Sequence, residues 1–179
     1  MKIHIFLVAA LAATFMYSSA SLAQDINDEE KRFSGVYGGL TAGFGDFSSA
    51  GDGSVVDFFV GARKQTETGI VYGIEAVGGF IDSESREPFL DLFDGYGSII
   101  GKVGYTPNNK VLWYGGLGYT SLDVANEIQN NGSSGGAVLE AGVEYMPNSW
   151  FGLRLRAQYH AVGDEADISN VGAGVFFSF

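Results

Sequence analysis

Charged side chains recur at every second position in several short segments of this 179-residue sequence. Arg154 and Arg156 have this spacing, and Glu140 and Glu144 share one parity in an earlier segment. Because successive side chains of a β-strand point to opposite faces, each segment would carry its charges on one face and apolar side chains on the other. Opposite charges arranged in this way could form ion pairs or could line a path for ions.

Eight charged residues lie on the polar face of such segments, and their charges balance. They are Asp57, Glu75, Glu140, Glu144, Arg63, Lys102, Arg154 and Arg156. Balance favours an enclosed polar face, because an unpaired charge removed from water costs several kcal/mol. If the turn 147–149 joins two paired strands, Glu144 lies nearly opposite Arg154, and Glu140 lies nearly opposite Arg156. Two interpretations of this ion-pair network in a lumen remain open: a static polar core and a gated ion path.

Catalytic chemistry has little support in the sequence. His160 is the one histidine beyond the first 23 residues, and acyl transfer or hydrolysis commonly combines a histidine with a serine and a carboxylate. Val162 stands where a His-x-Ser pair would place the serine, although Glu165, Asp167 and Ser169 follow nearby. We therefore predict no enzymatic activity. A single histidine and no cysteine also predict no metal site, and we expect no cofactor.

The elements that would position these residues are strands. Eight segments of about ten residues show period-two alternation, and no stretch has a sustained helical period with caps. The segments are 34–45, 54–64, 69–80, 95–106, 111–121, 136–146, 150–161 and 168–179. Linkers alternate between short (65–68, 107–110, 147–149) and mostly longer, acidic ones (46–53, 81–94, 122–134, 162–167). This alternation is typical of an outer-membrane barrel with short periplasmic turns and long outer loops.

Two all-β solutions compete, because a soluble barrel or sandwich would turn the apolar face inward, whereas a membrane barrel would turn it toward lipid. Glycine is abundant on the polar face, as a narrow eight-stranded interior requires. Aromatic residues of the apolar face gather in two groups near opposite strand ends, as lipid–water interfaces favour. One group is Tyr72, Tyr105, Trp113, Tyr145, Phe151 and Phe179, and the other is Phe44, Phe58, Phe80, Tyr119 and Tyr159. We predict an all-β fold, an eight-stranded antiparallel up-and-down transmembrane β-barrel.

The domain organisation follows from the N-terminal composition. Residues 1–23 contain a charged start, an apolar run of about 12 residues and a small-residue end, which predicts a cleaved secretory signal peptide rather than a membrane span of about 20 residues. We interpret 24–33 as a flexible periplasmic tail and 34–179 as the barrel. A formal net charge of −11 argues against nucleic-acid binding, and the absence of cysteine excludes disulfides.

With the strands placed, the chain resembles the eight-stranded outer-membrane β-barrel superfamily, which includes OmpA-type barrel domains and small porin-like surface antigens of alphaproteobacteria. The resemblance covers residues 34–179 and rests on GVYGGLTAGFG, GIVYGIEA, GKVGYTPNNKVLWYGGLGYTSLD, AGVEYMPNSWFGLRLRAQY and NVGAGVFFSF. It implies a location in the outer membrane of a Gram-negative bacterium, with outer-membrane lipid and lipopolysaccharide as surroundings. Val171, Val175, Phe177 and Phe179 resemble the C-terminal signal that the barrel-assembly machinery reads during biogenesis.

The outer loops carry the remaining functional hypotheses. Their many carboxylates suit solvation, or divalent cations that bridge to lipopolysaccharide, or a basic partner, and segment 87–93 holds apolar side chains within an acidic loop. We expect a structural role in envelope integrity and in the display of surface loops. The alternatives are a small porin-like channel for ions or small solutes, and an adhesin.

Overall fold

The alternating segments form eight antiparallel strands in the computed structural model, which describes residues 31–46, 52–83, 94–123, 133–162 and 166–179. The strands are β1 (Gly35–Asp46), β2 (Asp52–Gln65), β3 (Ile70–Ser83), β4 (Asp94–Tyr105), β5 (Val111–Asp123), β6 (Ser133–Tyr145), β7 (Phe151–Val162) and β8 (Ala166–Ser178). Several strands extend beyond the predicted bounds at the end of the long linkers, because the hydrogen-bonded ladders continue there. No described residue belongs to a helix long and apolar enough to cross a membrane.

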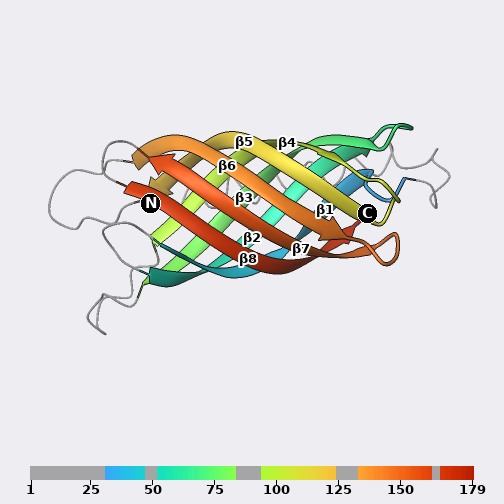
Figure 1. Cartoon of the computed structure of the whole chain (residues 1–179). Helices are drawn as coiled ribbons and strands as arrows, with labels where there is room; N and C mark the ends of the chain where they lie inside the picture. The colour runs from blue at the N-terminus through green and yellow to red at the C-terminus, as the bar shows by residue number, and fades with distance from the viewer. Residues whose placement is uncertain (1–30, 47–51, 84–93, 124–132, 163–165) are drawn as a thin grey trace, which may run out of the picture.

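Each strand pairs with its neighbours in chain order, and β1 pairs with β8 to close the barrel (Figure 1). The closing ladder runs from Tyr37 opposite Ser178 to Asp46 opposite Ser169. Closure leaves no unpaired strand edge, which is the condition for a sheet that spans lipid. The predicted fold class is confirmed.

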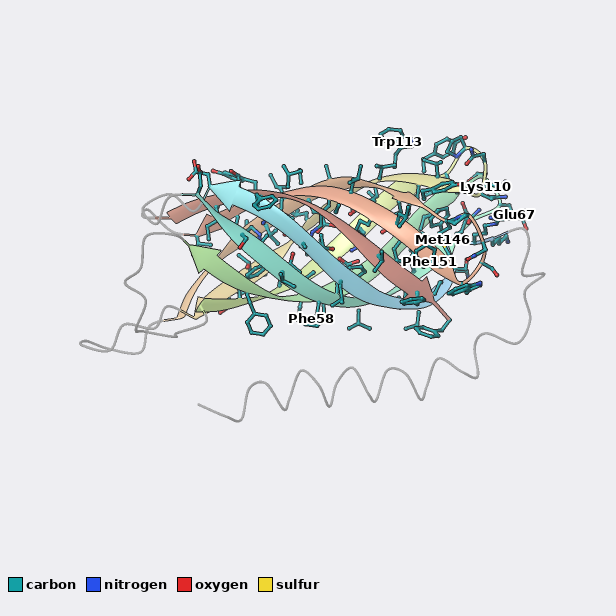
Figure 2. All side chains as sticks on the ribbon, turned by 90° about the horizontal axis from the view of Figure 1, so that it is seen from below. Phe58, Glu67, Lys110, Trp113, Met146 and Phe151 are labelled. Atoms are coloured by element: carbon teal, nitrogen blue, oxygen red, sulfur yellow. The ribbon has the colours of Figure 1, made fainter. Side chains whose placement is uncertain are left out.

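On each strand the alternate residues that include the charged side chains face the lumen, and the apolar residues between them face outward. Arg154 and Arg156 are 1% and 2% exposed, whereas their chain neighbours Leu153 and Leu155 are 44% and 58% exposed. Figure 2 shows Phe58 and Trp113 pointing away from the barrel, with Trp113 nearer the short turns that carry Glu67 and Lys110. An ordinary globular protein would have the reverse arrangement, so hydrocarbon is the solvent that suits this surface.

Two of the three short turns use the same device. Asn108 Oδ1 accepts hydrogen bonds from the backbone N–H groups of Lys110 and Val111, and Asn148 Oδ1 accepts from those of Trp150 and Phe151. Such Asx turns reverse the chain over a few residues. They connect β4 to β5 and β6 to β7 at the short-turn end of the barrel, close to Lys102, Glu144 and Arg154.

The predicted signal peptide lies outside the described residues, and so does most of the predicted tail 24–33. The end of that tail needs correction, because Phe33 is fully buried. The Arg63 guanidinium lies 5.0 Å from the centroid of the Phe33 ring, and Arg32 Nη1 donates to the carbonyl oxygen of Met146 at 3.1 Å. Phe33 covers the lumen at its short-turn end, so the chain joins the barrel's packing before β1 begins.

Candidate functional site in the barrel lumen

Arg154 projects into the lumen and bridges two carboxylates from different strands. Its Nη1 and Nη2 donate to Glu75 Oε1 and Oε2 at 3.0 and 2.8 Å. Its Nε and Nη2 donate to Glu144 Oε1 at 3.0 and 2.6 Å. Glu144 lies directly opposite Arg154 on β6, whereas Glu75 projects from β3 on the other side of the barrel. The forked, charge-assisted contact to Glu75 therefore ties opposite walls together.

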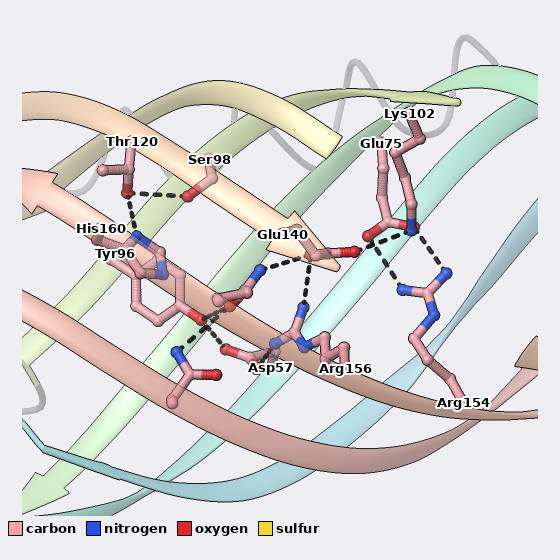
Figure 3. A network of polar contacts seen from close by, with 12 residues as sticks. Asp57, Glu75, Tyr96, Ser98, Lys102, Thr120, Glu140, Arg154, Arg156 and His160 are labelled. Atoms are coloured by element: carbon pink, nitrogen blue, oxygen red, sulfur yellow. Dashed lines mark hydrogen bonds and ion pairs between the residues drawn. The ribbon is translucent and has the colours of Figure 1, made fainter. Parts of the chain in front are cut away.

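Lys102 of β4 extends this cluster to a third carboxylate. Its Nζ lies 3.1 Å from Glu75 Oε2, 3.0 Å from Glu140 Oε1 and 3.9 Å from Glu144 Oε1. The position of the ammonium group between these acids neutralises carboxylates that would otherwise repel one another. Figure 3 shows Lys102, Glu75 and Arg154 converging from their separate strands.

The remaining three charged residues attach at the two ends of this cluster. Arg63 Nη1 pairs with Glu144 Oε2 at one end. At the other end Arg156 Nη1 lies 3.6 Å from Glu140 Oε2, and Arg156 Nη2 pairs with Asp57 Oδ2. All eight predicted residues thus form one chain of alternating charge. Its order is Arg63, Glu144, Arg154, Glu75, Lys102, Glu140, Arg156, Asp57.

The strand register corrects one predicted pair. Glu144 is opposite Arg154 as expected, but Glu140 is opposite Gln158, and Arg156 is opposite Gly142. In an antiparallel ladder a step of two residues on one strand is matched by a step of two on the other, in the opposite chain direction. Four residues from Glu144 to Glu140 therefore reach Gln158, whose Nε2 donates to Glu140 Oε2 at 2.7 Å.

Aromatic rings form the walls around these charges, and the sequence reasoning missed them. Arg154 Cζ lies 3.8 Å from the centroid of the Phe59 ring, and Lys102 Nζ lies 3.8 Å from that of Tyr114. Cations over ring faces gain further electrostatic stabilisation. The Tyr37 hydroxyl donates to Glu75 Oε2 at 2.7 Å. For Phe59 the available signal was its position on β2, because it lies on the same face of the strand as Asp57 and Arg63.

The outer half of the lumen holds a smaller polar cluster around His160. Its Nδ1 lies 3.3 Å from Thr120 Oγ1, and Ser98 Oγ donates to the same Thr120 oxygen at 2.8 Å. The Tyr96 ring stands edge-on to the imidazole at a centroid distance of 5.1 Å, and its hydroxyl donates to Asp57 Oδ1. His160 is 1% exposed, so it faces the interior rather than the membrane.

The chemistry that this arrangement supports is ion pairing. Each of the eight charged groups in this series is held by at least one opposite charge. Among the described residues, no group of three or more His, Asp or Glu side chains is placed to hold a metal ion. The predicted apolar loop segment 87–93 and most of the acidic loop residues lie outside the described residues.

The four residues of the predicted C-terminal signal face outward. Val171, Val175, Phe177 and Phe179 are all exposed on the outer surface. Phe177 stacks on Trp150 at a centroid distance of 5.9 Å, and the Phe179 backbone N–H donates to the carbonyl oxygen of Val36 at 2.8 Å. The last residues of the chain therefore complete the seam between β8 and β1.

Known structures share this architecture. Neisserial surface protein A matches with a TM-score of 0.56 and 18% identity, over 80% of this chain and 97% of that chain. Ail, the attachment invasion locus protein of Yersinia pestis, matches with 0.55 and 15%, over 80% and 96%. The N-terminal β-barrel domain of Pseudomonas aeruginosa OprF matches with 0.54 and 14%, over 80% and 97%. At these identities the likeness establishes the fold.

A comparison with curated proteins gave no match. The family described as "Outer membrane protein beta-barrel domain" matches residues 6–179. This match spans nearly the whole chain. It agrees with the closed barrel and with its apolar outer surface and charged interior. The chain therefore belongs to the outer membrane protein beta-barrel domain family, whose members lie in the outer membrane of Gram-negative bacteria.

Proposed function

We propose that this chain is a structural protein of the outer membrane, which contributes to envelope integrity and holds surface loops on a barrel with an occluded lumen. The observation that carries this proposal is the chain of eight alternating charges, which runs from Arg63 to Asp57 through the barrel interior. It links β2, β3, β4, β6 and β7. Ion pairs between these strands fill the lumen, so it acts as a packed core made of polar groups.

Energetics favour occlusion over conduction. Removal of one partner from a buried ion pair typically costs about 3–5 kcal/mol, because the other charge stays buried and uncompensated. Arg154 would have to leave two carboxylates and the Phe59 ring before an ion could pass. The short-turn end is closed a second time by Phe33, Phe176 and Met146, all of which are fully buried.

Planar-bilayer conductance of the refolded protein tests this proposal. We expect no steady openings in the wild-type protein. Steady wild-type openings that vanish in the Glu140→Gln, Arg156→Gln double variant would contradict it and would identify a channel whose ions pass along these charges. Migration on gels with and without heating shows whether each preparation contains a folded barrel.

A small channel is the second candidate, and one observation favours it. Within the described part of the chain, Arg156 Nε, His160 Nε2 and Asn170 Oδ1 are buried without a hydrogen-bond partner. Buried polar atoms of this kind commonly bind internal water. All three belong to residues on the long-linker side of Arg154 in the β7–β8 ladder, so water bound to them would hydrate that part of the lumen. The same conductance measurement decides between the two candidates.

The position of His160 supports the proposal that the protein is not an enzyme. This imidazole is enclosed in the lumen with Thr120 and Tyr96, away from the outer surface where the barrel contacts lipid. Lipid A from cells that express the protein should therefore keep its mass. A mass change that disappears in a His160→Gln variant would overturn this part of the proposal.

A further inference from the structure

The outer surface of the barrel carries a groove of about 750 Å³ over β2, β3, β4 and β5. Its floor is formed by Gly101 of β4 and Gly115 of β5. Ile74, Val103 and Leu117 form its walls, and each of these side chains is more than half exposed. The register places Gly101 between Ile74 and Leu117, and it places Val103 beside Gly115. The groove is thus a depression between projecting apolar side chains.

The protein's own packing does not require glycine at these two positions. A Cβ on Gly101 would come no nearer than 3.7 Å to another atom, and a Cβ on Gly115 no nearer than 3.9 Å. By contrast, a Cβ on the lumen-facing Gly116 would lie 2.7 Å from the Ile100 side chain. The space over Gly101 and Gly115 is therefore available to something outside the barrel, and its lining is apolar.

A positive charge stands at the short-turn end of the groove. Lys64 is exposed, lines the groove and lies opposite Tyr72 in the β2–β3 ladder. At outward-facing positions of the described strands it is the one lysine or arginine. The outward-facing acidic residues Asp46 and Asp52 lie opposite each other in the β1–β2 ladder, at the long-linker end of these strands.

This placement matches one leaflet of the membrane. Short turns of outer-membrane barrels lie on the periplasmic side. Lysine extends its apolar stem along the barrel and presents its ammonium group at the level of lipid headgroups. Tyrosine also favours that interface. Lys64 and Tyr72 are therefore at the depth of phosphate groups, directly beside a groove of acyl-chain character.

We propose that this groove binds an anionic glycerophospholipid of the periplasmic leaflet, with one acyl chain over Gly101 and Gly115 and the phosphate at Lys64. A second copy of the barrel suits the surface less well. Two copies related by a two-fold axis along the membrane normal would bring Lys64 toward Lys64, while Asp46 and Asp52 remain at the far end of the strands.

Native mass spectrometry of the refolded full chain tests the proposal, with phosphatidylglycerol and phosphatidylcholine of identical acyl chains as probes. We expect wild-type protein to retain one phosphatidylglycerol in preference to phosphatidylcholine. Lys64→Gln should lower retention of phosphatidylglycerol about fivefold, since a lysine near an anionic surface contributes an attraction of that order. Lys110→Gln is the matched control, because Lys110 is exposed in a neighbouring short turn, and it should change retention little.

Gly115→Leu tests the apolar half of the site separately. The side chain would fill the groove without meeting protein atoms near its Cβ, so the barrel should fold, and retention of both lipids should fall. Equal loss in Lys64→Gln and Lys110→Gln would overturn the proposal, because the attraction would then be a general surface effect. Unchanged retention in Gly115→Leu, or a wild-type dimer that Gly115→Leu dissociates, would also overturn it.

Discussion

Arg154 of β7 donates two hydrogen bonds across the lumen to Glu75 of β3, at 3.0 and 2.8 Å. These strands are not neighbours in the barrel, so the contact joins opposite walls across the lumen. It therefore fixes the distance between those walls, which the hydrogen bonds between adjacent strands do not. Both side chains are almost completely removed from solvent, so each depends on its ion-pair partners for compensation of its charge, Glu75 on Arg154 and Lys102, and Arg154 on Glu75 and Glu144.

Arg154→Gln should destabilise the barrel more than any exposed substitution. Glu75 and Glu144 would both lose their main cation, and the expected loss in the free energy of unfolding is about 3–5 kcal/mol. Urea unfolding of protein refolded into vesicles measures it. Lys110→Gln is the control and should stay within about 0.5 kcal/mol, as surface substitutions do. A loss for Arg154→Gln no larger than that of the control would mean that the chain of charges does not hold the barrel together.

The parity of the sequence predicts which charges enter the lumen but not which charges meet there. Pairing along adjacent strands is local, so Glu144 could be placed opposite Arg154 from one turn. The contact between Arg154 and Glu75 depends on the diameter of the barrel and the stagger of its strands, which two-residue periodicity does not encode. For the same reason the sequence did not reveal that Lys102 reaches Glu140 of β6.

The aromatic filling shows a different limit. Phe59 lies on the same face of β2 as Asp57 and Arg63, yet an aromatic residue in a membrane strand is also suited to the lipid face. Alternation alone therefore shows which residues of a strand share a face with the ring. The chemical character of those residues then indicates whether that face is the interior. Phe33 was harder still, because it precedes the first alternating segment and fills the lumen end from outside any strand.

Tyr37→Phe should weaken the network without disturbing its packing. The substitution removes only the hydroxyl that donates to Glu75, and hydrogen bonds to charged groups contribute about 1.5–3 kcal/mol. Tyr72→Phe is a matched control on the outer surface, where the hydroxyl faces the interface. Chemical unfolding should separate the two variants. Equal effects would show that the Tyr37 hydroxyl is not a significant partner of the carboxylate.

Gly152→Ala and Gly101→Ala form a matched pair that tests which face is the interior. A Cβ on Gly152 would overlap the Phe176 ring inside the lumen, so we expect a loss of about 1–3 kcal/mol from overpacking. A Cβ on Gly101 has no atom nearer than 3.7 Å, so that variant should be unchanged or more stable by about 0.4–1 kcal/mol. If Gly101→Ala were the more damaging of the two, the assignment of faces would be wrong.

Phe179→Ala should separate assembly in cells from folding in vitro. We propose that the outward side chains of Phe177 and Phe179 serve as the signal for barrel assembly. Phe179 is 79% exposed, so its removal leaves the interior intact. The amount of protein in outer membranes should fall, while refolding into detergent should keep its yield. Phe44→Ala, which alters a 78% exposed ring far from the C-terminus, should leave both unchanged. An equal fall for Phe44→Ala would contradict a signal at the C-terminus.

Phe33→Ala tests whether ions are blocked by the aromatic residue at the short-turn end of the lumen or by the ion pairs within it. The ring is fully buried beneath Arg63, so truncation should cost about 3 kcal/mol or more in the free energy of unfolding. Conductance should nevertheless stay absent, because the charges from Arg63 to Asp57 still occupy the interior. Steady currents in Phe33→Ala, absent in wild type and in Phe44→Ala, would show that the barrier to ions is the plug formed by this residue. The proposed occlusion by ion pairs would then be wrong even if the barrel proved as stable as expected.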